Sequence, residues 1–297
     1  IDKHRILNAI AKKSPELLDS NADANHPLYD QTNQSLRGIF AVAAWRQAVK
    51  GGLDLSDSGG LPLVSTLRQD SQRCVLDLNL SGCRTLQDRD LTNIRYAMPE
   101  RLRRLSFGAS KCSTKCSKIS DVGMCELAEG IATLQNLTYL HLNCPQLRNL
   151  SARSIDAIGH SIQACSSLVD LNLNFAWCEK LSSVDELGKG IARQKKLVRL
   201  RLVFTGCDEL ETIDEIWHAV VSLTHLTCLE LSFGRCAGLT SICSFDLGVA
   251  CLETLDSFVV DFRDCYHFDS VDELGKFVGL QTSVGSLAGR LSKLLRH

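Results

Sequence analysis

The chain has 297 residues, a hydrophobic content of 44% with only 6% aromatic residues, and a formal net charge of −1 at pH 7. This balance excludes the overall positive charge that draws proteins to nucleic acid or to anionic membrane surfaces. No apolar run is long enough to span a bilayer, and the opening residues IDKHR lack the apolar region of a signal peptide. Because the first residue is Ile1 rather than Met, we expect the chain to be part of a larger protein.

The first part of the chain does not carry the repeat that organises the rest. Apolar spacing predicts two helices, through residues 2–18 and 35–50, and Gly-Gly ends the second one. We interpret residues 1–52 as a helical N-terminal cap over the first layer of repeats, with a docking helix for another domain as the alternative. Residues 53–72 contain a short LDL and a helical segment after a proline, which predicts a stunted half-repeat.

The residues that follow form an array of units of about 29 residues. The clearest copies begin at Leu168 and Leu255, which are 87 residues apart, and both contain SVDELGK. The skeleton LxxLxLxFxxCxxL predicts one short strand and one helix per unit, and such a unit must stack on its neighbours to bury its apolar face. Full units are expected to begin at Arg73, Leu102, Leu137, Leu168, Leu197, Leu226 and Leu255.

Two units are longer than the others, and the repeat fades near the end of the chain. The units that begin at Leu102 and Leu137 each have a longer helical segment than the others. The first of them also carries the insertion KCSTKC after its strand. We therefore assign residues 73–280 to seven repeats. Apolar residues spaced along residues 281–297 predict an amphipathic capping helix at the far end.

Cysteine recurs at the eleventh position of most units. A periodic cysteine is interpreted as a structural column, in which a small, polarizable side chain fills the turn after each strand. Free thiols of this kind are typical of a reducing compartment, so we expect a cytoplasmic protein. Three Asn-X-Ser/Thr sequons leave a secreted protein as the alternative, although the first, at Asn79, would lie on a strand. The column consists of Cys83, Cys112, Cys178, Cys207, Cys236 and Cys265.

These units resemble the leucine-rich repeat family, in particular its ribonuclease-inhibitor-like and cysteine-containing subtypes. The resemblance is carried by the LxxLxL cores, by the cysteine column and by CSKISDVGMCELAEGIATLQNL from Cys116, and it covers residues 73–280. It implies an α/β solenoid, a curved horseshoe with a parallel inner sheet and outer helices, that binds other proteins. The sequence departs from the family where an additional apolar residue, such as Phe175, precedes the cysteine, so we expect strands about two residues longer than usual.

The alternation within each strand predicts which side chains are available to a partner. The fourth, sixth and eighth positions of a unit are apolar and face the core, so the third, fifth and seventh positions form a grid on the other face. Tyr, Trp and Arg commonly anchor protein interfaces. A merely solvated face, or binding through the helical flanks, is the alternative. The candidate partner-binding residues are Tyr139, His141, Asp170, Asn172, Asn174, Arg199, Arg201 and Glu230 on the strands, with Trp177, Arg235 and Arg263 near the strand ends.

No motif in the sequence predicts catalysis. A phosphate-binding glycine loop, a nucleophile elbow and a zinc-binding helix motif are all missing. Cys112 and Cys116 have a metal-like spacing but lack a second pair of ligands. His141 and Asp170 belong to neighbouring open strands without a nucleophile or an enclosed pocket. We therefore predict no catalytic residue, no metal and no cofactor.

Taken together, these features predict a non-enzymatic scaffold or recognition module that binds a protein partner on the concave sheet face. We expect a monomer, with neither nucleic acid nor a membrane as partner. One alternative is a regulator of an enzyme, such as a GTPase-activating protein. The other is the sensor domain of a larger receptor or kinase.

Overall fold

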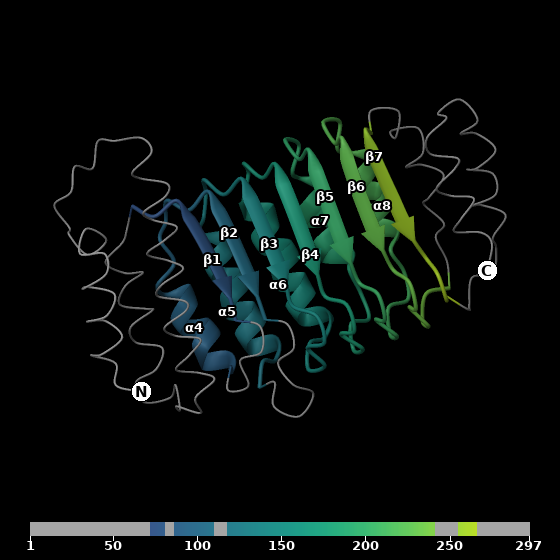
Figure 1. Cartoon of the computed structure of the whole chain (residues 1–297), viewed down its shortest axis with the longest axis horizontal. Helices are drawn as coiled ribbons and strands as arrows, with labels where there is room; N and C mark the ends of the chain where they lie inside the picture. The colour runs from purple at the N-terminus through teal and green to yellow at the C-terminus, as the bar shows by residue number, and fades with distance from the viewer. Residues whose placement is uncertain (1–71, 81–85, 110–117, 241–254, 266–297) are drawn as a thin grey trace, which may run out of the picture.

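The computed structural model describes residues 72–80, 86–109, 118–240 and 255–265 (Figure 1). The predicted N-terminal cap and C-terminal helix lie outside the described residues, as does the predicted half-repeat except for its last residue. Cys83, Cys112 and Cys116 also lie outside them.

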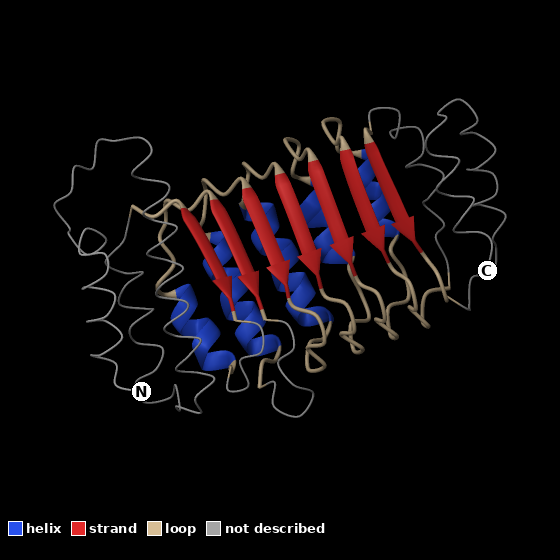
Figure 2. Ribbon diagram, in the orientation of Figure 1, coloured by secondary structure: helices blue, strands red, loops and turns tan. Residues whose placement is uncertain are grey.

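The described residues form an α/β solenoid of two layers, which confirms the predicted fold class. Seven parallel strands make one open sheet in the order of the sequence, and the five described helices all lie on one side of it (Figures 1 and 2). The strands are β1 (Val75–Asn79), β2 (Arg104–Gly108), β3 (Tyr139–Asn143), β4 (Asp170–Asn174), β5 (Arg199–Val203), β6 (Cys228–Ser232) and β7 (Ser257–Asp261). The helices are α4 (Asp88–Arg95), α5 (Asp121–Ala132), α6 (Ala152–Ala164), α7 (Asp185–Ala192) and α8 (Asp214–Val221).

Every strand starts at the third residue of its predicted unit and pairs in register with the next. Leu140 of β3 lies opposite Leu171 of β4, which in turn lies opposite Leu200 of β5. These leucines are buried against the helices. Because side chains alternate along a strand, the third, fifth and seventh residues project from the opposite side of the sheet. We call that side the open face.

The strands are shorter than predicted. Each has five residues, and β4 ends at Asn174, directly before Phe175. Backbone bonding between units nevertheless continues past the strands, since the amide of Phe175 donates to the carbonyl of Val203 at 2.8 Å and that of Trp177 to the carbonyl of Thr205 at 2.7 Å. The additional apolar residue therefore belongs to a hydrogen-bonded turn and not to a longer strand.

The phenylalanines at this eighth position form a stack that runs through the core. The ring centroids of Phe175 and Phe204 are 6.0 Å apart, those of Phe204 and Phe233 are 5.8 Å apart, and those of Phe233 and Phe262 are 6.0 Å apart. The interplanar angles are 24°, 6° and 16°, so each ring lies nearly parallel to the next. Identical positions in register thus give an aromatic column beside the leucines.

The cysteine column follows the phenylalanines and is confirmed at the four described positions. Each thiol is free and donates a hydrogen bond to a backbone carbonyl of the preceding unit. Burial raises the pKa of Cys178 and that of Cys236 to about 12, so both thiols stay protonated at neutral pH. The donors are Cys178, Cys207, Cys236 and Cys265, and the acceptors are the carbonyls of Cys144, Phe175, Phe204 and Phe233, at 3.6, 3.4, 3.2 and 3.1 Å.

The helical layer differs between the long and short units. Helices α5 and α6, in the two long units, have 12 and 13 residues, whereas α4, α7 and α8 have eight each. Asp88 at the start of α4 accepts bonds from the backbone amide and the hydroxyl of Ser120, the N-cap of α5, at 2.8 and 2.6 Å. Asp121 does the same for Ser151, the N-cap of α6. These carboxylates link the beginnings of successive helices and satisfy amides that the helices leave unpaired.

Helices α6 and α7 approach each other closely because both carry glycine at the contact. A methyl group on Gly190 would collide with the backbone carbonyl of Gly159, and one on Gly159 with the carbonyl of Glu186. Glycine in a helix interior costs about 1 kcal/mol relative to alanine. The close packing of α6 against α7 explains why these helices contain glycine despite that cost.

Candidate partner-binding surface

The eight candidate residues predicted for the strands all lie on the open face of β3 to β6. The register aligns Tyr139 with Asp170, and Asp170 with Arg199, across three neighbouring strands. Asn172 lies between His141 and Arg201 in the next row. The placement of these side chains is therefore confirmed, while their role in binding stays a prediction.

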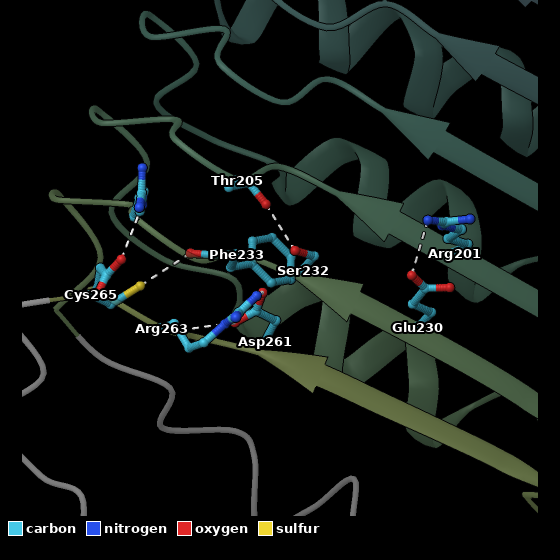
Figure 3. A network of polar contacts seen from close by, with 10 residues as sticks. Arg201, Thr205, Glu230, Ser232, Phe233, Asp261, Arg263 and Cys265 are labelled. Carbon is cyan, nitrogen blue, oxygen red and sulfur yellow. Dashed lines mark hydrogen bonds and ion pairs between the residues drawn. The ribbon is translucent and has the colours of Figure 1, made fainter. Parts of the chain in front are cut away.

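Ion pairs between neighbouring strands hold the two central arginines. Nε of Arg199 donates to a carboxylate oxygen of Asp170 at 2.6 Å, and this hydrogen bond raises the pKa of Arg199. A terminal nitrogen of Arg201 lies 3.1 Å from a carboxylate oxygen of Glu230, as Figure 3 shows. Glu230 of β6 is thus the counter-ion of Arg201, and Arg199 has a separate counter-ion on β4.

Aromatic contacts extend the surface toward β2. The guanidinium of Arg104 lies 4.7 Å from the ring centroid of Tyr139, within the range of a cation–π contact. The rings of Tyr139 and His141 meet edge to face, with centroids 6.4 Å apart. Burial, the largest cause, and the charge of Arg201 lower the pKa of His141 by more than the charges of Asp77 and Asp170 raise it, so the imidazole is mostly neutral at pH 7. A neutral histidine there contributes shape and hydrogen bonding to the surface without adding positive charge.

An amide pair occupies the end of β4. Nδ2 of Asn174 donates to Oδ1 of Asn143 at 3.0 Å, and Oδ1 of Asn174 accepts from the backbone amide of Ala176 at 3.0 Å. These bonds fix the Asn174 side chain between two strands and the turn. Its role is at least partly structural, which the sequence pattern did not indicate.

In the five units from Leu137 onward, the tenth positions form a row along the edge of the sheet, just after the strands. Trp177, Arg235 and Asp264 all have left-handed backbone there, with φ of 62°, 61° and 61°. Gly206 occupies the same position at φ 72°, and a methyl group on it would collide with the indole ring of Trp177. The guanidinium of Arg235 lies 5.9 Å from the centroid of that ring.

The two arginines of this edge have different partners. Arg235 donates from Nε to a carboxylate oxygen of Asp264 at 3.0 Å. Arg263 instead turns back to the strand and donates from Nε and Nη2 to the two oxygens of Asp261, at 2.9 and 2.8 Å (Figure 3). The structure therefore brings Trp177 and Arg235 together and places Arg263 with β7.

The predicted candidates did not include every polar residue on this surface, and Arg104, Asp264 and Thr205 are examples. Arg104 shares the row of Tyr139, and Asp264 shares the row of Trp177 and Arg235. Thr205 forms a hydroxyl pair with Ser232 at 2.8 Å, next to the phenylalanine column (Figure 3). Their position within the repeat was the available signal, because residues at equal positions of adjacent units are neighbours in the sheet.

Within the described residues we looked for a metal site, an acid–base pair and a membrane-spanning helix. Among its His, Cys, Asp and Glu side chains, no group of three or more is arranged to hold a metal ion. In the strand register, His141 lies directly opposite Asn172. Asp170 lies opposite Tyr139, so His141 and Asp170 are only diagonal neighbours. No helix in these ranges combines the length and the apolar character required to cross a bilayer.

Comparison with known proteins adds no family to this description. Neither the scan against protein-family models nor the search of curated proteins gives a match. The class that the geometry defines is an α/β repeat solenoid with its described helices on one side of the sheet (Figure 2). The other side of the sheet carries polar and aromatic side chains.

Proposed function

We propose that the chain is a non-enzymatic protein-binding module whose partner docks on the open face between β3 and β6. The observation that carries this proposal is the in-register sheet, which has all the described helices on its other side. Tyr139, Arg199 and Arg201 belong to the residue types that most often anchor interfaces. Their ion pairs and ring contacts hold them in place before a partner arrives, which reduces the entropy lost on binding.

The dimensions of the sheet indicate that the edge row belongs to the same interface. From β3 to β6, four strands about 4.8 Å apart and five residues long cover roughly 14 by 17 Å, or about 240 Å² in projection. A standard protein interface buries about 800 Å² on each partner. Adding the turn residues Trp177 and Arg235 brings the surface closer to that size.

We also propose that the chain is a leucine-rich repeat protein that works as a monomer in the cytoplasm. One strand and one helix in each unit of about 29 residues support the family assignment. The free thiols of the cysteine column support a reducing compartment.

Site-specific photo-crosslinking tests the binding face. A photoreactive amino acid replaces Asn172 at the centre of the open face and, in a matched control, Gln163, which is exposed on α6. We expect the first probe to capture one partner from native lysate in near-stoichiometric yield and the second to capture none of it. The partner, once purified, should bind the wild-type chain and lose affinity for an Arg199→Glu/Arg201→Glu variant with an unchanged circular dichroism spectrum. Equal capture by both probes would place the binding site elsewhere and refute the proposal.

A further inference from the structure

We infer that the partner presents a short acidic segment to this surface, and that Arg199, Arg201, Arg235 and Arg263 contact it. This inference rests on the proposed function and specifies the chemistry of the partner. Each of the four arginines is paired with its own carboxylate, so the surface is close to neutral in charge. The two members of each pair, however, are not equally accessible to a partner.

In every one of these pairs the arginine is the more exposed member. The side chain of Arg199 is 60% exposed and that of its partner Asp170 is 17% exposed. The side chain of Arg263 is 70% exposed, against 20% for Asp261. The other two pairs differ in the same direction. The guanidinium groups are therefore the more accessible charges, and an approaching protein meets them more readily than the carboxylates.

The guanidinium groups also keep hydrogen-bond donors for a second acceptor. Arg199 and Arg235 each bind their carboxylate through Nε. Within the described residues, neither has a protein acceptor for its two Nη atoms. Those atoms carry four N–H donors, which suit a carboxylate in bidentate geometry. Because the first carboxylate already orients each arginine, a second can bind with little further ordering.

A short acidic segment fits this arrangement better than a nucleic acid. A long phosphate chain requires a continuous positive stripe, and here carboxylates alternate with the arginines. The turn after Gly206 also carries the exposed Asp208 and Glu209, which would repel a polyanion that extended past the edge row. A peptide can place single carboxylates against individual arginines and an apolar side chain against Trp177, which is 38% exposed.

Fluorescence anisotropy with labelled probes tests the inference. The probes are an extended peptide of about 12 residues with glutamate at alternate positions, long enough to cross the sheet at about 3.3 Å per residue, the same peptide with glutamine or lysine, and a single-stranded DNA of equal length. We expect only the glutamate peptide to bind, and its affinity to fall with added salt.

Two variants that each remove one charge of the same ion pair supply the matched control. Arg201→Gln should weaken binding of the glutamate peptide by about threefold or more, because one contact is lost. Glu230→Gln should strengthen it by a similar factor, because the carboxylate that competes for Arg201 is gone. A purely structural role for the pair would shift both affinities in the same direction.

Several results would overturn the inference. They are no binding of the glutamate peptide, equal binding of the glutamine peptide or the DNA, and shifts of the same sign in the two variants. If the partner captured through Asn172 binds both variants as tightly as the wild type, the inference fails and the proposed function stands. If Asn172 captures no partner, the proposed function itself fails.

Discussion

The stack of phenylalanine rings should stabilise the array beyond the burial of its individual members. Phe204 is fully buried and stacks on Phe175 at 6.0 Å and on Phe233 at 5.8 Å. Replacing it with leucine keeps an apolar side chain but removes two ring contacts, each contributing about 0.5–1.5 kcal/mol. We expect Phe204→Leu to lower the free energy of unfolding by about 1–3 kcal/mol from lost stacking alone.

Phe175→Leu is the matched control for this prediction. Phe175 is equally buried, but its unit is preceded by one with Cys144 at the equivalent position, and its described stacking partner is Phe204 alone. It should therefore lose one ring contact and be less destabilised than Phe204→Leu by about 0.5–1.5 kcal/mol. Urea unfolding followed by far-ultraviolet circular dichroism measures both values. Equal losses in the two variants would show that volume, and not ring stacking, determines stability at this column.

Three further predictions concern the backbone and the thiols. Gly159→Ala should lower the free energy of unfolding by about 1–3 kcal/mol, measured by urea titration, because the new methyl group collides with the carbonyl of Glu186; an unchanged midpoint would contradict the close helix contact. Trp177→Gly should be more stable than Trp177→Ala by about 1 kcal/mol in calorimetry, because φ is +62°; equal stability would contradict the left-handed turn. Burial raises the pKa of Cys178 and Cys236 from 9.0 to about 12. Their stabilising contribution should be complete below pH 9 and be lost as the pH rises toward 12, by about 1 kcal/mol per thiol at pH 10. Replacing both with alanine should reduce this pH dependence of the unfolding midpoint, and the remainder should come mainly from Cys207 and Cys165, whose pKa values burial also raises.

The positions of the strands and the open face were predictable because each unit repeats one apolar pattern. Once Leu171 and Leu200 are assigned to the core, the alternation of side chains places Asp170, Asn172 and Arg201 on the other face without further information. A register error of one residue would have exposed every leucine, so the pattern determines the sheet strongly. The same argument correctly placed the cysteine column in the turns.

The features that the sequence did not reveal depend on side-chain and backbone conformation within the turns. The apolar pattern alone favoured a longer strand through Phe175, but the chain instead turns at Trp177 with left-handed backbone. Nothing in a tryptophan or an arginine at this position signals that conformation, which glycine adopts most readily. The sequence also did not reveal that Arg199 pairs with Asp170 of the neighbouring strand, because this contact depends on the side-chain conformations.

A single geometric property of the array accounts for its regular core and for the varied surface that we propose as a binding face. Equal positions of successive units are neighbours in the sheet, so a core position must suit its own copies on both sides, and the columns of leucine, phenylalanine and cysteine meet that requirement. The open face has no such requirement, and its first row changes from Tyr139 to Asp170 to Arg199 over three units. Uniform columns inside and varied rows outside are the arrangement expected of a scaffold that holds a particular set of contact residues in fixed relative positions. If the open face is the binding site, as we propose, changes there should alter binding and, except at Asn174 with its hydrogen bonds to Asn143 and Ala176, leave the stability of the array nearly unchanged.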